Sequence, residues 1–182
     1  MKIYKSLPAE NLSKVPGYMK LQRDCIANGA QADLYTSQTD DLIQHNVRLY
    51  TGHGSGSQLI AGAFTRRDGN GGAELCGVVV DIGHRGRGLG TELVQYIVGS
   101  EFAAGARRLE LVVRIYVDGK LNEKAARLYR SVGFMETGEV RTGQISDDPR
   151  VRNLAGSVDS EGRYRAAVFE LLAEADREVR YG

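Results

Sequence analysis

The sequence has few cysteines, no long apolar run and almost no excess charge, and each of these absences removes a class of protein. Two cysteines in 182 residues, Cys25 and Cys76, cannot build the disulfide framework of a small secreted domain. No apolar stretch approaches the length of a membrane span, and the first residues lack a signal-peptide pattern. A net charge of +1 gives no overall attraction to nucleic acid. We therefore expect a cytoplasmic protein without a membrane or nucleic-acid partner, built as a single domain over residues 1–182.

Known metal and phosphate patterns are also missing. The three histidines, His45, His53 and His84, are too scattered to predict a metal site, so we expect no metal. The P-loop string of glycine, four residues, glycine, lysine and serine or threonine does not occur, and glycines 86, 88 and 90 do not fit the dinucleotide fingerprint. Any phosphate site must therefore have another form.

What the sequence does contain is a turn rich in arginine and glycine, Arg85-Gly86-Arg87-Gly88-Leu89-Gly90. An apolar, β-branched run over residues 75–82 precedes it, and apolar residues at helical spacing predict a helix over about 89–104. A strand, a glycine turn and a helix present backbone N–H groups and a helix N-terminus to an anion, and the arginines add charged donors. From Arg85 to Arg130 there are nine Lys or Arg against five Asp or Glu, which suits an anionic cofactor.

A second pattern begins at Asn122 and ends at Gly133-Phe134. Asn122 is a good helix N-cap, and the helix that follows carries one apolar stripe, made by Ala125, Leu128, Tyr129 and Val132. Gly133 supplies the left-handed residue that ends the helix, and a strand begins at Phe134. Taken alone, Tyr129 is better explained as an aromatic residue that faces the core.

Together the two patterns resemble the GNAT superfamily of acetyl-CoA-dependent N-acetyltransferases. Arg85-x-x-Gly88-x-Gly90 is similar to the family's [QR]-x-x-G-x-[GA] pyrophosphate loop, and residues 122–134 are similar to N-x-x-A-x-x-x-Y-x-x-x-G-F. The resemblance covers about residues 47–134. It implies an α/β fold with a mixed, mostly antiparallel sheet flanked by helices, in which one parallel strand pair splays apart and CoA enters the gap.

The hydrophobic pattern predicts elements that suit such a fold. We expect strands over residues 1–7, 47–52, 59–67, 73–82, 108–116 and 164–172, with glycine-rich hairpins that make 47–82 an antiparallel meander. A helix between strands 73–82 and 108–116 makes those two strands parallel. One or two helices are expected within 8–46, interrupted at Pro16-Gly17 and Asn28-Gly29. The polar chain from Glu136 predicts a long connection with a loop insertion at about 141–162, and residues 173–180 predict a short helix.

The resemblance also implies which residues bind acetyl-CoA, the acyl donor. The backbone of Val78, Val79 and Val80 should hold the pantetheine arm, and Asn122 matches a residue that contacts this arm or its bound water. The diphosphate should lie against the turn and the start of the helix, that is, against Arg85, Gly86, Arg87, Gly88, Leu89, Gly90 and Thr91. Glycine at positions 88 and 90 is expected to let the diphosphate approach the backbone.

Acetyl transfer to an amine requires a base, because an amine with a pKa of ~10.4 is neutral in only about one molecule in 2,500 at pH 7. Glu74 is the predicted base, and strand alternation would place it on one face with Cys76, Val78 and Val80. The alternative is that Glu74 follows a hairpin and points into water. Tyr129 matches the position whose phenol protonates the leaving thiolate. Neither cysteine has activating neighbours in the sequence, so direct transfer in a ternary complex is expected rather than an acyl-cysteine intermediate.

Two other functions remain open at this point. The first is a regulatory module that binds CoA or acyl-CoA without transferring the acyl group. The second is an RNA-binding protein that uses the Arg85–Gly88 repeat, against which the near-neutral charge argues. The sequence does not indicate which amine is the acceptor, and it leaves the oligomeric state open, a homodimer included.

Overall fold

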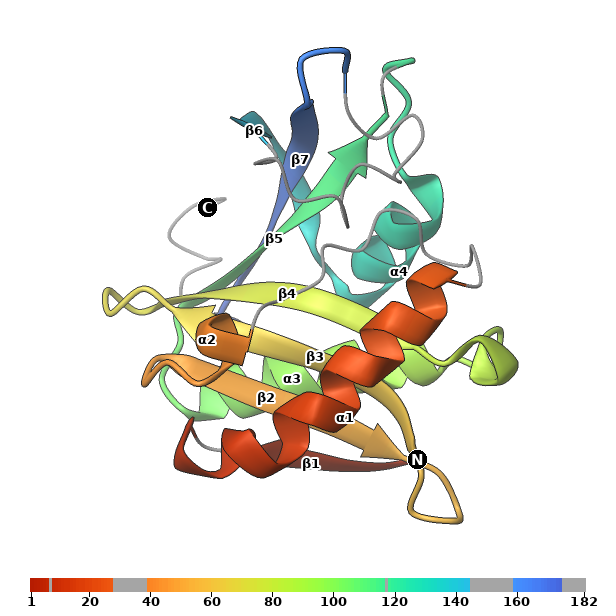
Figure 1. Cartoon of the computed structure of the whole chain (residues 1–182). Coiled ribbons are helices and arrows are strands. Elements are labelled where there is room, and N and C mark those ends of the chain that lie inside the picture. The colour runs from red at the N-terminus through yellow and green to blue at the C-terminus, as the bar shows by residue number, and fades with distance from the viewer. Residues whose placement is uncertain (7, 28–38, 117, 145–158, 175–182) are drawn as a thin grey trace.

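A computed structural model describes residues 1–6, 8–27, 39–116, 118–144 and 159–174 (Figure 1). Its strands form one sheet in the order β1-β2-β3-β4-β5-β7-β6. The β4–β5 pair is parallel, and the other neighbouring pairs are antiparallel. The strands are β1 (Lys2–Ser6), β2 (Val47–His53), β3 (Leu59–Arg67), β4 (Gly72–Val80), β5 (Arg108–Ile115), β6 (Met135–Gln144) and β7 (Arg163–Leu172). The predicted α/β class, the meander and the parallel crossover are therefore confirmed.

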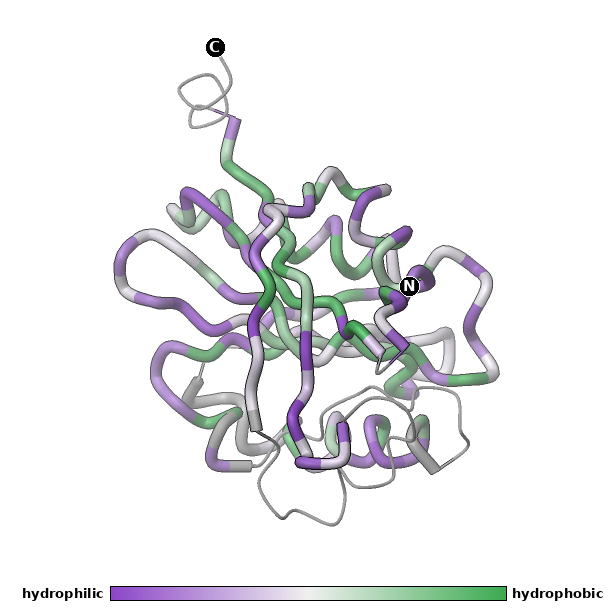
Figure 2. Tube along the Cα trace, turned by 90° about the horizontal axis from the view of Figure 1, so that it is seen from above, coloured by the Kyte–Doolittle hydropathy of each residue, from purple (hydrophilic) through white to green (hydrophobic). Residues whose placement is uncertain are grey.

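Helices cover both faces of the sheet. They are α1 (Pro8–Ala27), α2 (Thr39–Leu42), α3 (Leu89–Ala103) and α4 (Glu123–Val132), with a 3₁₀ turn η1 (Ile82–His84) before α3. One core lies between the sheet and α3 and α4, and it includes Leu93, Ile97, Leu111 and Phe169. A second core lies under α1, which crosses the front of the sheet in Figure 1. Figure 2 shows hydrophobic segments crossing the middle of the molecule and hydrophilic segments in the outer loops.

Helix α1 contradicts the predicted interruption at Pro16-Gly17. The helix continues through Pro16, which is exposed, although proline removes one helical hydrogen bond. Val15, Tyr18 and Leu21 on either side of it are buried against the sheet. This burial stabilises the helix despite the proline. The second predicted break, Asn28-Gly29, lies outside the described residues.

Strand β6 contradicts the prediction that a long connection begins at Glu136. The strand extends to Gln144 and pairs with β7, so the polar residues 136–144 are strand. As the outer strand of the sheet, β6 is largely exposed and needs no alternation of apolar residues, which is why its sequence looked like a loop. Most of the predicted 141–162 insertion and of the 173–180 helix lies outside the described residues.

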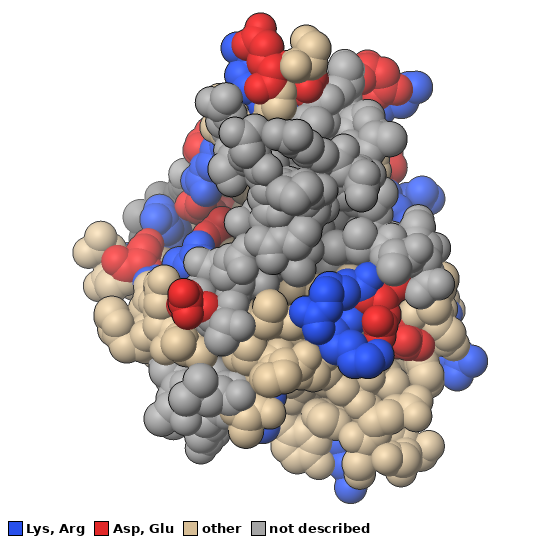
Figure 3. Space-filling model, in the orientation of Figure 1, with Lys and Arg blue, Asp and Glu red and all other residues tan. Residues whose placement is uncertain are grey.

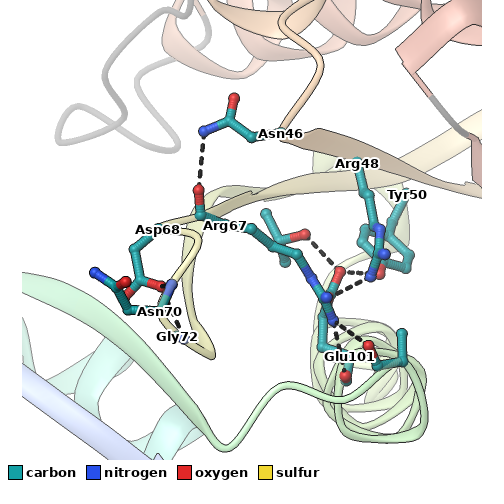
Figure 4. A network of polar contacts seen from close by, with 10 residues as sticks. Asn46, Arg48, Tyr50, Arg67, Asp68, Asn70, Gly72 and Glu101 are labelled. Atoms are coloured by element: carbon teal, nitrogen blue, oxygen red, sulfur yellow. Dashed lines mark hydrogen bonds and ion pairs between the residues drawn. The ribbon is translucent and has the colours of Figure 1, made fainter.

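A buried carboxylate, that of Glu101 in α3, fastens this helix to the sheet (Figure 4). It accepts hydrogen bonds from Tyr50 Oη (2.6 Å), Thr65 Oγ1 (2.7 Å), Arg48 Nη1 (2.7 Å) and Arg67 Nε (3.0 Å). Burial alone would raise the pKa of Glu101, but these hydrogen bonds and the Arg48 charge outweigh it and lower the pKa. The network holds α3, and with it the turn that precedes α3, against strands β2 and β3.

Candidate active site

The parallel strands β4 and β5 form a fork. Their pairing consists of Gly72 with Arg108, Ala73 with Leu109 and Glu74 with Glu110, whereas both strands continue beyond these pairs. In Figure 1 the two strands start together and diverge, with β5 and β7 rising away from the plane of β1–β4. The predicted splayed pair is therefore confirmed, and the second half of β4 has no hydrogen bonds to β5.

A β-bulge lies where the two strands separate. Gly77 and Val78 of β4 together oppose the single residue Ala63 of β3, and Gly77 has a positive φ of 61°. Tyr18 of α1, which is fully buried, donates a hydrogen bond to the Gly77 carbonyl (2.6 Å) and accepts one from Gln22 (2.7 Å). Helix α1 is thereby attached to the bulge through the Tyr18 hydroxyl.

The bulge reverses which side chains of β4 share a face. Val78 and Val80 pack on the α3 side of the sheet, whereas Cys76 packs in the core under α1. Glu74, two residues before Cys76, lies on the same side as Cys76. The predicted common face of Glu74, Cys76, Val78 and Val80 is therefore wrong, because an extra residue in the strand shifts the alternation by one.

The turn between β4 and α3 has the backbone form of an anion site. Gly86 and Gly88 have φ values of 74° and 77°, and Gly88 is the N-cap of α3 with no side-chain hydrogen bond to the helix. A Cβ added at either glycine would meet no atom within 4 Å. The N-terminus of α3 is thus exposed to an incoming anion.

Gly90 has a different role from the one predicted. A Cβ at this position would lie 2.9 Å from Leu128 Cδ1 of α4, so glycine here lets α3 and α4 pack closely. The expectation that Gly90 keeps the backbone open to the diphosphate is therefore corrected: the space beside it is filled by α4.

The two arginines of the turn point in different directions. Arg85 Nε donates a hydrogen bond to the Val80 carbonyl (2.9 Å) and so connects the turn to the end of β4. Arg87 is exposed and lines a hollow beside β1 and the β2–β3 hairpin. Leu89 and Thr91 begin α3 and are partly buried.

Helix α4 carries the other predicted residues. Asn122 caps it, with Oδ1 accepting a hydrogen bond from the Ala125 N–H (3.2 Å), and Gly133 ends it with a φ of 103°, so both predicted caps are confirmed. Tyr129 is partly buried and packs edge to face on Phe134 (6.0 Å between ring centroids). Burial, and next the nearby Cys76 thiol, raise the pKa of Tyr129, and its hydroxyl has no hydrogen bond to the described residues.

Glu74 lies at the closed end of the fork. It is partly exposed, and its carboxylate is 3.6 Å from Arg66 Nη1 on the neighbouring strand. Together with Glu110 and Arg141 it lines a hollow of about 250 Å³. The Arg66 ion pair keeps the carboxylate near β3, so contact with an amine held further along the fork would require a bridging water.

The thiols are not activated. Burial, and then the Glu74 charge, raise the pKa of Cys76, and burial raises the pKa of Cys25 although Arg85 opposes this shift. Both thiols are therefore protonated at neutral pH, which does not favour them as nucleophiles. Among the residues that the structure describes, no three His, Cys, Asp or Glu side chains gather as metal ligands. Within the same residues, no helix has both the length and the hydrophobicity needed to cross a membrane.

The forked parallel pair, the glycine turn at a helix N-terminus and the tyrosine on the next helix are the features by which the sequence resembled the acetyltransferases. Residues 16–134 match the model of the acetyltransferase (GNAT) family, so the chain belongs to this family. No curated protein matches the sequence.

Solved structures of N-acetyltransferases have the same fold. The ribosomal-protein-S18-alanine N-acetyltransferase from Escherichia coli superposes with a TM-score of 0.66 at 19% identity, over 94% of each chain. The ribosomal-protein-alanine N-acetyltransferase from Brucella melitensis gives 0.65 at 17% identity, over 95% of this chain and 100% of that one. An N-acetyltransferase from Staphylococcus aureus Mu50 gives 0.64 at 18% identity, over 94% and 97%. At these identities the likeness establishes the fold and not the substrate.

Sequence reasoning missed the residues that shape the bulge. Tyr18 and Gln22 lie in the part of the chain whose pattern was least regular, and Gly77 lies inside an apolar run that looked like an uninterrupted strand. An isolated glycine within a strand pattern is a known sign of a bulge, and it was the only available signal.

Proposed function

We propose that the protein is an acetyl-CoA-dependent N-acetyltransferase that moves the acetyl group to a primary amine by direct attack in a ternary complex. The observation that carries this proposal is the fork, in which β5 leaves β4 after Glu74 and the glycine turn of α3 follows the open half of β4. An extended thioester arm laid along the open half of β4 would have its diphosphate at the turn. The membership of the GNAT family supports the same donor.

Acetyl-CoA binding is assigned to β4 and the turn. The backbone of Val78, Val79 and Val80 would pair with the pantetheine arm, and residues 85–91 would receive the diphosphate through the N–H groups of the turn and of α3. In this proposal Arg85 fixes the end of β4 through the Val80 carbonyl. Asn122, whose Oδ1 caps α4, would set the position of the helix that carries Tyr129 and would contact the arm through its remaining polar atoms.

The reaction forms a C–N bond and breaks a C–S bond. The neutral amine nitrogen attacks the thioester carbonyl carbon, a backbone N–H near Val80 stabilises the oxyanion, and the CoA sulfur leaves as a thiolate. Tyr129 would give its proton to this sulfur, and the burial that raises its pKa keeps the phenol protonated at neutral pH. Glu74 would take the proton of the amine through a bridging water, because its carboxylate lies at the closed end of the fork.

The test is release of free thiol from acetyl-CoA by the full-length protein in the presence of amines. The panel should contain polyamines, aminoglycosides, lysine peptides and peptides with N-terminal alanine, the last because two structural neighbours are ribosomal-protein-alanine acetyltransferases. We expect amine-dependent thiol release and a product heavier by one acetyl group. If the protein binds CoA tightly in calorimetry but releases no thiol with any amine of a broad panel, the proposed catalysis is contradicted. The protein would then be a module that binds CoA without transferring the acyl group.

A further inference from the structure

A hollow of about 890 Å³ lies at the end of the sheet beside the turn and is separate from the fork. It is formed where β1, the β2–β3 hairpin and the segment between β4 and α3 meet, on the right of Figure 1. Its lining includes Lys2, Tyr4, Lys14, His53, His84 and Arg87, and we call it the cationic hollow. Cavities of roughly 300–1,000 Å³ are large enough for a small organic ligand.

The charged residues of the cationic hollow are all of one sign. Its lining contains Lys2, Lys14 and Arg87 but no Asp or Glu, and within the described part of the chain these three side chains form no ion pair. On the face of the molecule drawn in Figure 3, by contrast, acidic and basic side chains lie next to each other. Unpaired like charges around one cavity repel each other, and a bound anion would relieve this repulsion.

The smaller hollow at the closed end of the fork provides the contrast. It is lined by four arginines, and three of them pair with carboxylates that line the same hollow: Arg66 with Glu74, Arg108 with Asp68, and Arg141 with Glu110. The charges there are satisfied within the protein. In the cationic hollow Lys2, Lys14 and Arg87 have no carboxylate partner among the described residues, and only the ammonium of Met1 pairs with one, that of Glu92.

Two further contacts order the wall of the cationic hollow. His84 Nδ1 lies 2.7 Å from Asp81 Oδ1, which fixes the ring, and His84 Nε2 lies 3.3 Å from Gln58 Nε2 at the lining. The rings of Tyr4 and His53 pack edge to face at 5.3 Å, and Tyr4 is 48% exposed. The hollow therefore has an accessible aromatic surface next to its cations.

We propose that the cationic hollow binds a nucleoside polyphosphate, with the phosphates at Lys2, Lys14 and Arg87 and the base against Tyr4. Charge-assisted contacts from lysine and arginine are suited to phosphate oxygens, and an exposed aromatic ring is suited to stacking on a base. This site goes beyond the proposed transferase function. Its lysines belong to β1 and α1, whereas the diphosphate of acetyl-CoA is assigned to backbone N–H groups of the turn. Because Arg87 is common to both, the two ligands should weaken each other's affinity by a few-fold without excluding each other.

The experiment is calorimetric titration of the full-length protein with ATP in buffer with EDTA. We expect the Lys2→Gln/Lys14→Gln double variant to bind ATP at least tenfold more weakly than wild type. Lys20→Gln, which removes an exposed lysine of the same helix α1 outside the hollow, should bind ATP like wild type. Tyr4→Ala should weaken ATP several-fold and leave the affinity for inorganic pyrophosphate unchanged.

Several outcomes would overturn the proposal. They are no ATP binding by wild type, equal affinity in the double variant and the Lys20→Gln control, and no effect of Tyr4→Ala on ATP. Complete displacement of ATP by CoA, together with loss of ATP binding in a Gly88→Glu variant, would show that ATP occupies only the turn. A protein that binds ATP as expected but releases no thiol from acetyl-CoA would contradict the proposed function and leave the cationic hollow as a site.

Discussion

Tyr129 is the residue whose environment best matches a single chemical task. Its hydroxyl has no hydrogen bond to the described residues, and burial raises its pKa, so the phenol carries its proton at neutral pH. A thiolate that forms in the same buried surroundings is also destabilised by desolvation, which raises its basicity and lets it accept this proton. We expect Tyr129→Phe to lower kcat by about 10²–10⁴-fold, the usual contribution of a general acid, with little change in the KM for acetyl-CoA. Steady-state thiol release measures both constants.

Phenylalanine keeps the ring that packs on Phe134, so the variant should unfold at the same denaturant concentration as wild type. An unchanged kcat in a folded Tyr129→Phe protein would leave the residue as a core aromatic and remove the proposed acid. A large rise in KM alone would instead assign Tyr129 to binding.

Gly88 tests the turn as an anion site. Its left-handed φ and the open space around its Cα provide room for a diphosphate, and a glutamate there adds negative charge to the N-terminus of α3. We expect Gly88→Glu to abolish CoA binding in calorimetry while the circular dichroism spectrum stays that of a folded protein. Gly99→Glu is the matched control, because Gly99 lies within α3 and a Cβ added there would also meet no atom within 4 Å. Equal CoA affinity in the two variants would rule out the turn as the diphosphate site.

At the scale of elements, the bulge in β4 and helix α1 stabilise each other through the contact between Gly77 and Tyr18. A Cβ at Gly77 would collide with the Tyr18 hydroxyl and approach Gln22 and Phe64, and the positive φ adds backbone strain. We expect Gly77→Ala to lower the free energy of unfolding by about 2–4 kcal/mol, which combines ~1–2 kcal/mol of left-handed strain with ~1–3 kcal/mol of overpacking. Urea unfolding followed by circular dichroism measures the change.

A double-mutant cycle separates the two causes. Tyr18→Phe removes the hydroxyl that bonds the Gly77 carbonyl and should cost about 1–2 kcal/mol by itself. In that background the Gly77→Ala substitution should cost less, because the nearest colliding atom is absent. Strict additivity of the two substitutions would show that the contact between Tyr18 and the bulge does not couple α1 to β4.

The elements that were predicted correctly are those specified by residues close to them in the sequence. Helix α4 was predicted almost to the residue because its N-cap Asn122 and its C-terminal Gly133 act within one turn of the helix ends. The start of strand β6 was predicted at Phe134, but its extension to Gln144 was missed, because an exposed outer strand is specified by the backbone of β7, which lies far along the chain. The bulge was missed because an extra residue in β4 can be recognised only when the pairing of β4 with β3 is known.

At the scale of the whole molecule, the sheet and α3 are joined by a network that no local pattern indicated. Glu101 lies in a helix, where a glutamate is usually an exposed residue, and its partners come from β2 and β3. Only the packed fold brings these side chains together. The turn and the fork were predictable from motifs, whereas the support that holds the turn in place had to come from the structure.

The Glu101 network makes the stability of the molecule depend on pH in a direction that can be stated. The folded state lowers the pKa of Glu101 from its ordinary 4.5, so the stabilisation is fully present above pH 4.5 and is lost as the pH falls through the lower, folded-state value. Glu101→Gln cannot accept all four hydrogen bonds and leaves Arg48 and Arg67 without a carboxylate. We expect it to lower the free energy of unfolding at pH 7 by about 3 kcal/mol, the lower end of the range for a broken buried pair, because both arginines keep contact with water.

The difference between wild type and Glu101→Gln should therefore shrink as the pH is lowered from 5 towards 3. Other carboxylates with lowered pKa values, such as Asp68, are present in both proteins, so their contributions cancel in the difference. Urea unfolding of both proteins at matched ionic strength across this pH range gives the comparison. A difference that stays constant with pH would mean that Glu101 stabilises α3 by packing and not by its charge, and the turn would then not depend on an ionised carboxylate beneath it.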